Sequence, residues 1–99
     1  MAEFTTLLTS LESGILTITL NRPGSYNAFN DEMKTELSGA LREAEKNPAT
    51  RCIVLRGAGD KAFCSGQDLK EHAGAKRSLR ESLEKTYNPL IRKIRTIEK

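Results

Sequence analysis

The sequence lacks the features of several large protein classes. Its 99 residues include no tryptophan, one histidine and only two cysteines. The longest run of apolar residues, at positions 52–55, has four members, whereas a membrane-spanning helix needs about 20. The first ten residues have neither a basic start nor an apolar stretch, so they do not resemble a secretory signal. Cysteines without an export signal are typically reduced thiols, and we therefore expect a cytoplasmic protein that binds no membrane.

A strong charge of one sign is also absent. The chain has 16 Lys and Arg against 13 Asp and Glu, a net charge of +3, and only 5% aromatic residues. The positive excess lies in residues 67–99, which hold nine basic and five acidic side chains. A basic segment can bind nucleic acid, but interspersed acidic residues and few aromatic ones are more typical of a solvated helix surface. We therefore expect no nucleic-acid partner.

The length limits the architecture to a single domain. Domains usually contain roughly 100–200 residues, so residues 1–99 have no room for a separate second domain. Leu, Ile, Val and Phe together account for 22 residues, just above the level of about 20% below which disorder is expected. The composition therefore predicts one modest hydrophobic core.

The first half of the chain carries a strand pattern followed by a helix pattern. Residues 15–20 alternate between apolar and threonine side chains, the period of a half-buried strand. A shorter strand is predicted at 4–8, with a turn at 12–14 between the two. An apolar stripe with helical spacing follows Asn30, a favourable N-cap, and stops at Pro48.

The second half begins with another strand. The continuous apolar run at 52–55 is typical of a strand covered on both faces. A strand, a helix and a strand in this order predict a parallel crossover unit, and hence an α/β fold. Further on, a second amphipathic pattern runs from 78 to 97, and Pro89 interrupts it, so we expect a kink or a new helix start near Asn88.

Residues 63–69 form the candidate functional segment. A buried strand leads towards Gly66, after which a helix can begin at Gln67 or Asp68. The first N–H groups of a helix have no internal acceptor and carry partial positive charge. Such a start suits an oxygen that gains negative charge during a reaction. From these residues alone, a simple tight turn between strand and helix remains the more economical interpretation.

Other possible motifs are incomplete. Gly57 and Gly59 have no third glycine at position 62, as a dinucleotide loop requires. Ser65 lacks the flanking glycine pattern of a hydrolase nucleophile. His72 has no second His or Cys at metal-ligand spacing, so we expect no metal site.

Three short motifs resemble one known family in order and spacing. They are NRP at 21–23, NAFN at 27–30 and AFCSGQDL at 62–69, and together they resemble the crotonase (enoyl-CoA hydratase/isomerase) superfamily over essentially the whole chain. FNDEM at 29–33 and YNPL at 87–90 look more specifically like the 1,2-epoxyphenylacetyl-CoA isomerases of phenylacetate degradation. The resemblance implies a crotonase-like spiral of ββα units. Residues 1–99 would form the N-terminal part of one such domain, which is thus truncated.

The resemblance also implies a coenzyme A site. The backbone N–H of Gln67 would be the catalytic group, as one donor of an oxyanion hole, and Arg22 and Lys70 would lie near the phosphates. The implied substrate is an acyl-CoA thioester, with no further cofactor. The residues implied in binding it are Arg22, Ala28, Ala62, Gly66, Gln67, Asp68, Leu69 and Lys70.

The implied activity is that of an acyl-CoA isomerase or hydratase that stabilises a thioester enolate, in phenylacetate or fatty acid degradation. In the family, the second oxyanion donor and the catalytic carboxylates come from segments that would follow Lys99. We therefore expect the isolated chain to be inactive and the full-length protein to be a homotrimer or hexamer. The alternative is a non-catalytic fragment that binds coenzyme A or takes part in assembly.

Overall fold

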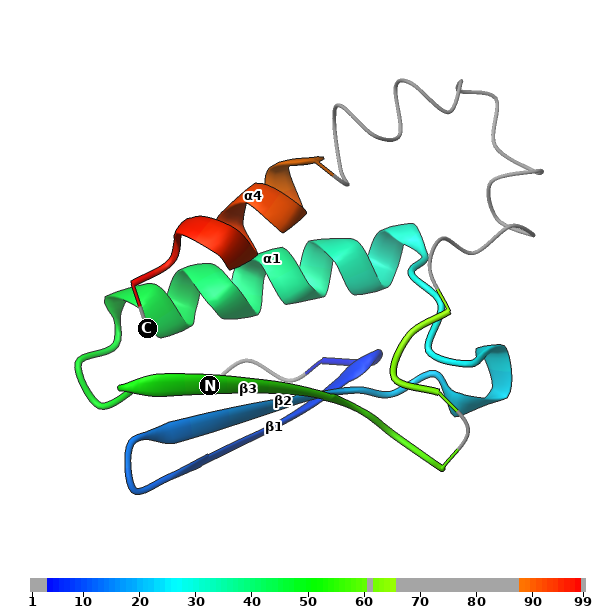
Figure 1. The fold of residues 1–99 in the computed structure, drawn as a ribbon, viewed down its shortest axis with the longest axis horizontal. Coiled ribbons are helices and arrows are strands. Elements are labelled where there is room, and N and C mark those ends of the chain that lie inside the picture. The colour runs from blue at the N-terminus through cyan, green and yellow to red at the C-terminus, as the bar shows by residue number, and fades with distance from the viewer. Residues whose placement is uncertain (1–3, 61, 66–87, 99) are drawn as a thin grey trace.

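The computed structural model describes residues 4–60, 62–65 and 88–98 as a three-stranded sheet with two layers of helix (Figure 1). Helix α1 lies along one face of the sheet, and α4 packs against α1. The strands lie in the order β1-β2-β3. In chain order the elements are β1 (Leu7–Glu12), β2 (Ile15–Leu20), a short 3-10 helix η1 (Pro23–Ser25), α1 (Asp31–Lys46), β3 (Cys52–Gly57) and α4 (Asn88–Thr96).

Strands β1 and β2 form an antiparallel hairpin with a two-residue turn. Ser13 and Gly14 both have positive φ, 51° and 82°, which is the backbone that matches the twist of a tight hairpin. Glu12 therefore pairs directly with Ile15. The predicted β2 is confirmed, but the prediction of a first strand at 4–8 is wrong, because β1 begins at Leu7 and continues to the turn.

A carboxylate of α1 binds the residues that precede β1. Glu36 on α1 accepts hydrogen bonds from Thr6 through the backbone N–H (2.8 Å) and the hydroxyl (2.6 Å). It accepts two more from Thr5, at 3.0 Å and 2.9 Å. Burial alone would raise the pKa of Glu36, but these four hydrogen bonds outweigh it and hold that pKa below its ordinary value. The contacts tie the start of the chain to α1.

The predicted crossover unit is confirmed. Helix α1 begins where expected, because Asn30 Oδ1 accepts a hydrogen bond from the N–H of Met33 at 2.8 Å. After α1, β3 returns beside β2 in parallel, with Ile15 opposite Cys52 and Leu20 opposite Gly57. Both strands therefore run towards the same edge of the sheet.

The core lies between the sheet and α1. Alternate residues of β2 face the helix and are buried, as the pattern predicts. The expectation that β3 is covered on both faces is wrong, since Cys52 is exposed and Val54 is 42% exposed. Among the described elements, a helix covers only one face of the sheet. The buried cluster comprises Leu7, Leu16, Ile18, Leu20, Phe29, Met33, Leu37, Ala40, Leu41, Ala44 and Leu90.

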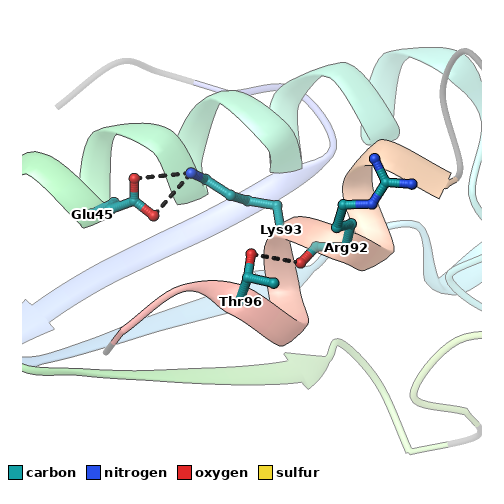
Figure 2. Close-up of polar contacts among 4 residues, drawn as sticks. All are labelled: Glu45, Arg92, Lys93 and Thr96. Atoms are coloured by element: carbon teal, nitrogen blue, oxygen red, sulfur yellow. Dashed lines mark hydrogen bonds and ion pairs between the residues drawn. The ribbon is translucent and has the colours of Figure 1, made fainter.

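Helix α4 spans Asn88–Thr96. Residues 78–87 of the expected amphipathic pattern lie outside the described residues, so the kink or new start near Asn88 stays a prediction. Leu90 is the buried anchor of α4. Figure 2 shows Lys93 reaching Glu45 of α1, with Nζ–O distances of 2.9 Å and 2.8 Å to the two carboxylate oxygens. The Thr96 hydroxyl donates to the Arg92 carbonyl at 2.8 Å within the last turn. None of the helices that the structure describes has the length and apolar composition needed to cross a membrane.

Candidate functional site

The candidate site lies at the sheet edge where β2 and β3 both end. Residues 21–30 follow β2, and residues 58–60 and 62–65 follow β3, and these two segments run side by side (Figure 1). The N–H of Ala58 donates to the Leu20 carbonyl at 2.8 Å and extends the strand pairing into this edge. In open α/β sheets, ligands bind outside the carboxyl ends of parallel strands. The topology therefore marks this edge as the place to look for a ligand.

The segment after β2 folds back on itself. Its 3-10 turn is followed by Tyr26 and Asn27, both left-handed, with φ of 53° and 57°. The N–H of Asn27 donates to the Arg22 carbonyl at 2.8 Å, and the N–H of Arg22 donates to Asn27 Oδ1, also at 2.8 Å. The loop is thus closed by a reciprocal pair of hydrogen bonds between residues 22 and 27.

Asn27 also joins this loop to the segment after β3. Its side-chain nitrogen donates to the carbonyls of Ala58 at 3.0 Å and Ala62 at 2.9 Å. The residue is only 1% exposed, so the hydrogen bonds form away from water. The N–H of Ser65 adds a further contact by donating to the Tyr26 carbonyl at 3.1 Å.

Glycine at position 57 lets the segment after β3 pass close to the strand. A Cβ on Gly57 would lie 2.5 Å from the carbonyl oxygen of Phe63 and 2.7 Å from that of Ala62. Because these atoms belong to backbone, a side chain would displace the segment rather than a flexible neighbour. Glycine at position 57 therefore permits this close approach of Ala62 and Phe63 to the end of β3.

A cavity of about 300 Å³ opens between the two segments. This volume is at the lower end of small-molecule sites, which span roughly 300–1,000 Å³. Four of the eight lining residues are glycine or alanine, whose small side chains let a ligand approach the main chain closely. The lining residues are Pro23, Gly24, Tyr26, Asn27, Ala58, Gly59, Asp60 and Ala62.

The structure describes three of the predicted site residues and brings them to this edge. Arg22 Nη1 donates to the Ala28 carbonyl at 2.6 Å, and Ala62 is linked to the same loop through Asn27. The Arg22 guanidinium is therefore held by its own loop, and its contact with phosphate stays a prediction. Gly66, Gln67, Asp68, Leu69 and Lys70 lie outside the described residues, so their roles also stay predictions.

Sequence reasoning missed the two residues that organise this edge. In the sequence, Asn27 is noticeable only as part of the NAFN motif, and Gly57 only as part of an incomplete glycine motif. The importance of Asn27 comes from contacts with residues 31 and 35 positions away. That of Gly57 comes from the backbone of Ala62 and Phe63, which passes close to it. In the part of the chain that the structure describes, no group of three or more His, Cys, Asp or Glu side chains could hold a metal ion.

Comparison with known proteins gives the family of this chain. The family described as "Enoyl-CoA hydratase/isomerase" matches residues 10–99. The chain belongs to this family.

Relatives extend the match to the whole chain. The 1,2-epoxyphenylacetyl-CoA isomerase of Escherichia coli K12 is 42% identical over 103 residues, which cover 100% of this chain and 38% of that protein. A probable enoyl-CoA hydratase of Rhodobacter capsulatus is 41% identical and covers 93% of this chain and 35% of that protein. The chain thus spans little more than a third of the length of these relatives.

Solved structures show the same crotonase fold. The enoyl-CoA hydratase of Bacillus anthracis superimposes with a TM-score of 0.86 at 26% identity, covering 94% of this chain and 36% of that one. An enoyl-CoA hydratase/isomerase structure from Mycobacterium abscessus gives a TM-score of 0.81 at 38% identity, and the match covers 92% of this chain and 36% of that one. The chain therefore folds as part of a crotonase domain, as its motifs predict.

Proposed function

We propose that this chain forms part of an enzyme that isomerises or hydrates acyl-CoA thioesters, and that it supplies the coenzyme A-binding edge and one oxyanion-hole donor. The observation that carries the proposal is the pairing of the two segments after β2 and β3. Asn27 holds them together, and the second segment leads directly into Gly66 and Gln67. Membership in the enoyl-CoA hydratase/isomerase family supports this assignment.

In this proposal, the backbone N–H of Gln67 donates to the thioester carbonyl oxygen. A proton leaves the carbon next to the carbonyl, and the oxygen takes up negative charge as the enolate forms. A fixed donor stabilises that charge without reorganising. Since the donor is main chain, the glutamine side chain is not required. The carboxylate that moves the proton would come from chain beyond Lys99.

The bound substrate would lie along the sheet edge. Arg22 and Lys70 are proposed to face the phosphates of coenzyme A, and Ala28, Ala62, Gly66, Asp68 and Leu69 to line its path. The Arg22 guanidinium has five N–H donors, of which Nη1 donates to the Ala28 carbonyl at 2.6 Å and Nη2 lies 3.5 Å from the Ser25 hydroxyl. The whole protein is proposed to be a cytoplasmic homotrimer or hexamer.

Isomerisation is the favoured reaction, with a ring epoxide or double bond of an acyl-CoA from phenylacetate degradation as substrate. The support is the 42% identity with the 1,2-epoxyphenylacetyl-CoA isomerase over the full chain. Hydration of an enoyl-CoA is the near alternative, because relatives of similar identity are named probable enoyl-CoA hydratases.

A proline substitution tests the oxyanion donor. Residues 1–99 are joined to the part of the E. coli isomerase outside the match, and turnover of 1,2-epoxyphenylacetyl-CoA and of an enoyl-CoA is measured. Gln67→Pro removes the N–H but suits the helix start that the sequence predicts there, so kcat should fall by about 10²–10³. Gln67→Ala keeps the N–H and should retain activity. Equal activity of the two variants would refute the proposed role.

A second candidate is a non-catalytic part that binds coenzyme A or takes part in assembly. Calorimetry of the 99-residue chain with acetyl-CoA separates the two candidates. Micromolar affinity without turnover, together with an inactive fusion, would support the second candidate over the first.

A further inference from the structure

We propose that Asn27 is a positioning residue that sets the spacing between the two walls of the coenzyme A-binding edge. The inference rests on the proposed function, because it concerns how that same site is held in shape. Asn27 itself touches protein backbone on both sides, so its role is to place the neighbouring residues that would meet the ligand.

The side chain of Asn27 uses its acceptor and its donor in opposite directions. Oδ1 accepts from the N–H of Arg22 within its own loop. Nδ2 donates to the carbonyls of Ala58 and Ala62 across the edge. Three hydrogen bonds of 2.8–3.0 Å thus depend on the side-chain amide of Asn27, a residue that is only 1% exposed.

These contacts fix residues on both walls. Ala28 follows Asn27 directly, and Ala62 accepts one of its hydrogen bonds, and both are proposed to line the coenzyme A path. The Arg22 guanidinium is bound to the Ala28 carbonyl, so its position depends on the same loop. A shift of Asn27 would therefore move a proposed phosphate ligand and both lining residues together.

Only asparagine meets all the requirements at this position. Its φ of 57° lies in the left-handed region, where Asn and Asp are favoured over other non-glycine residues. Aspartate accepts from Arg22 equally well but has no N–H to donate. Glycine adopts the backbone but has no side chain. These two substitutions separate the donor function from the backbone conformation.

The experiment compares Asn27→Asp and Asn27→Gly with the unmodified 99-residue chain by amide NMR. Hydrogen exchange is measured at Ser65, which reports the two walls, and at Ile18, which reports the core. Coenzyme A is then titrated in, and shifts at Ala28 and Ala62 give its dissociation constant. Because a buried acceptor left without its donor is costly, exchange at Ser65 should rise about tenfold or more. The dissociation constant should rise with it, while Ile18 keeps its protection.

Asn30→Asp is the matched control. It makes the same chemical change three residues away, where aspartate caps α1 as well as asparagine does, and it should behave as the unmodified chain. Unchanged exchange at Ser65 in both Asn27 variants would overturn the proposal. An equal rise at Ser65 and Ile18 would also overturn it, since Asn27 would then contribute only to overall stability.

The two proposals fail in different ways. If coenzyme A shifts no signal at Ala28 or Ala62 of the unmodified chain, the proposed coenzyme A-binding edge is refuted. The Ser65 exchange rates are measured without ligand, and they decide independently whether Asn27 holds the two walls together.

Discussion

The core beneath α1 and the site edge beyond β2 and β3 are stabilised by different forces. In the core, apolar side chains from β2 and α1 pack together, and Leu37 is only 1% exposed. At the edge, the two segments are joined by the Asn27 amide and by a close backbone approach at Gly57. The core therefore depends on the amount of apolar surface that it buries, whereas the edge depends on the exact shape of a few groups.

The largest expected effect tests the core half of this comparison. Leu37→Ala should lower the free energy of unfolding by about 2–5 kcal/mol, because it removes buried contacts and leaves a cavity. Leu8→Ala is the matched control on the opposite face of the sheet, where the side chain is 54% exposed, and it should change stability by no more than about 0.5 kcal/mol. Urea unfolding of both variants measures the difference. Similar losses would show that the two faces are buried alike.

Gly57→Ala tests how the site edge beyond β2 and β3 is stabilised. The added methyl would overlap the backbone of Ala62 and Phe63, so the variant should lose about 1–3 kcal/mol and show faster amide exchange at Ser65. Gly39→Ala is its control, since nothing lies within 4 Å of a Cβ at that position of α1. The control should gain up to about 1 kcal/mol from helix propensity. A stabilised Gly57→Ala would contradict the observed close approach.

A smaller effect is expected where the start of the chain meets α1. Glu36→Gln exchanges one accepting oxygen for a donor and should cost about 1–2 kcal/mol at pH 7. Because the pKa of Glu36 is lowered in the folded state, its contribution is complete above the unfolded pKa of about 4.3. It is lost as the pH falls through the folded value. The difference between the two proteins should therefore shrink towards pH 3.

Glu43→Gln controls for the charge change in that comparison. Glu43 is exposed and lies towards the other end of α1, so its substitution should have little effect on stability at either pH. Chemical unfolding of the unmodified chain and of both variants at pH 7 and pH 3 gives the values needed. A difference between Glu36→Gln and the unmodified chain that stays constant with pH would contradict the role of the carboxylate.

The sequence predicts the elements whose burial follows a regular period. Strand β2 and helix α1 emerge because Leu16, Ile18 and Leu20 alternate and because Asn30 precedes a helical stripe. The first strand was misplaced because Thr5 and Thr6 suit a strand locally but bind Glu36, 30 or more residues away.

The contrast between local sequence patterns and contacts distant in sequence also explains which parts of the site could be predicted. The motifs located Arg22, Ala28 and Ala62 at one edge through family resemblance. They could not reveal that Asn27 joins the two segments, since its hydrogen bonds to Ala58 and Ala62 span 31 and 35 residues. Such contacts exist only once β2 and β3 have come together in parallel.

The turn at Ser13 and Gly14 determines which of the neighbouring residues Leu7 and Leu8 faces the core. Leu7 is buried and Leu8 points to the other face, because consecutive strand residues alternate sides. Pairing is counted outward from Glu12 and Ile15, so inserting one residue into β1 next to this turn would exchange the two leucines. The length of the hairpin turn thus determines which residues of β1 face the core.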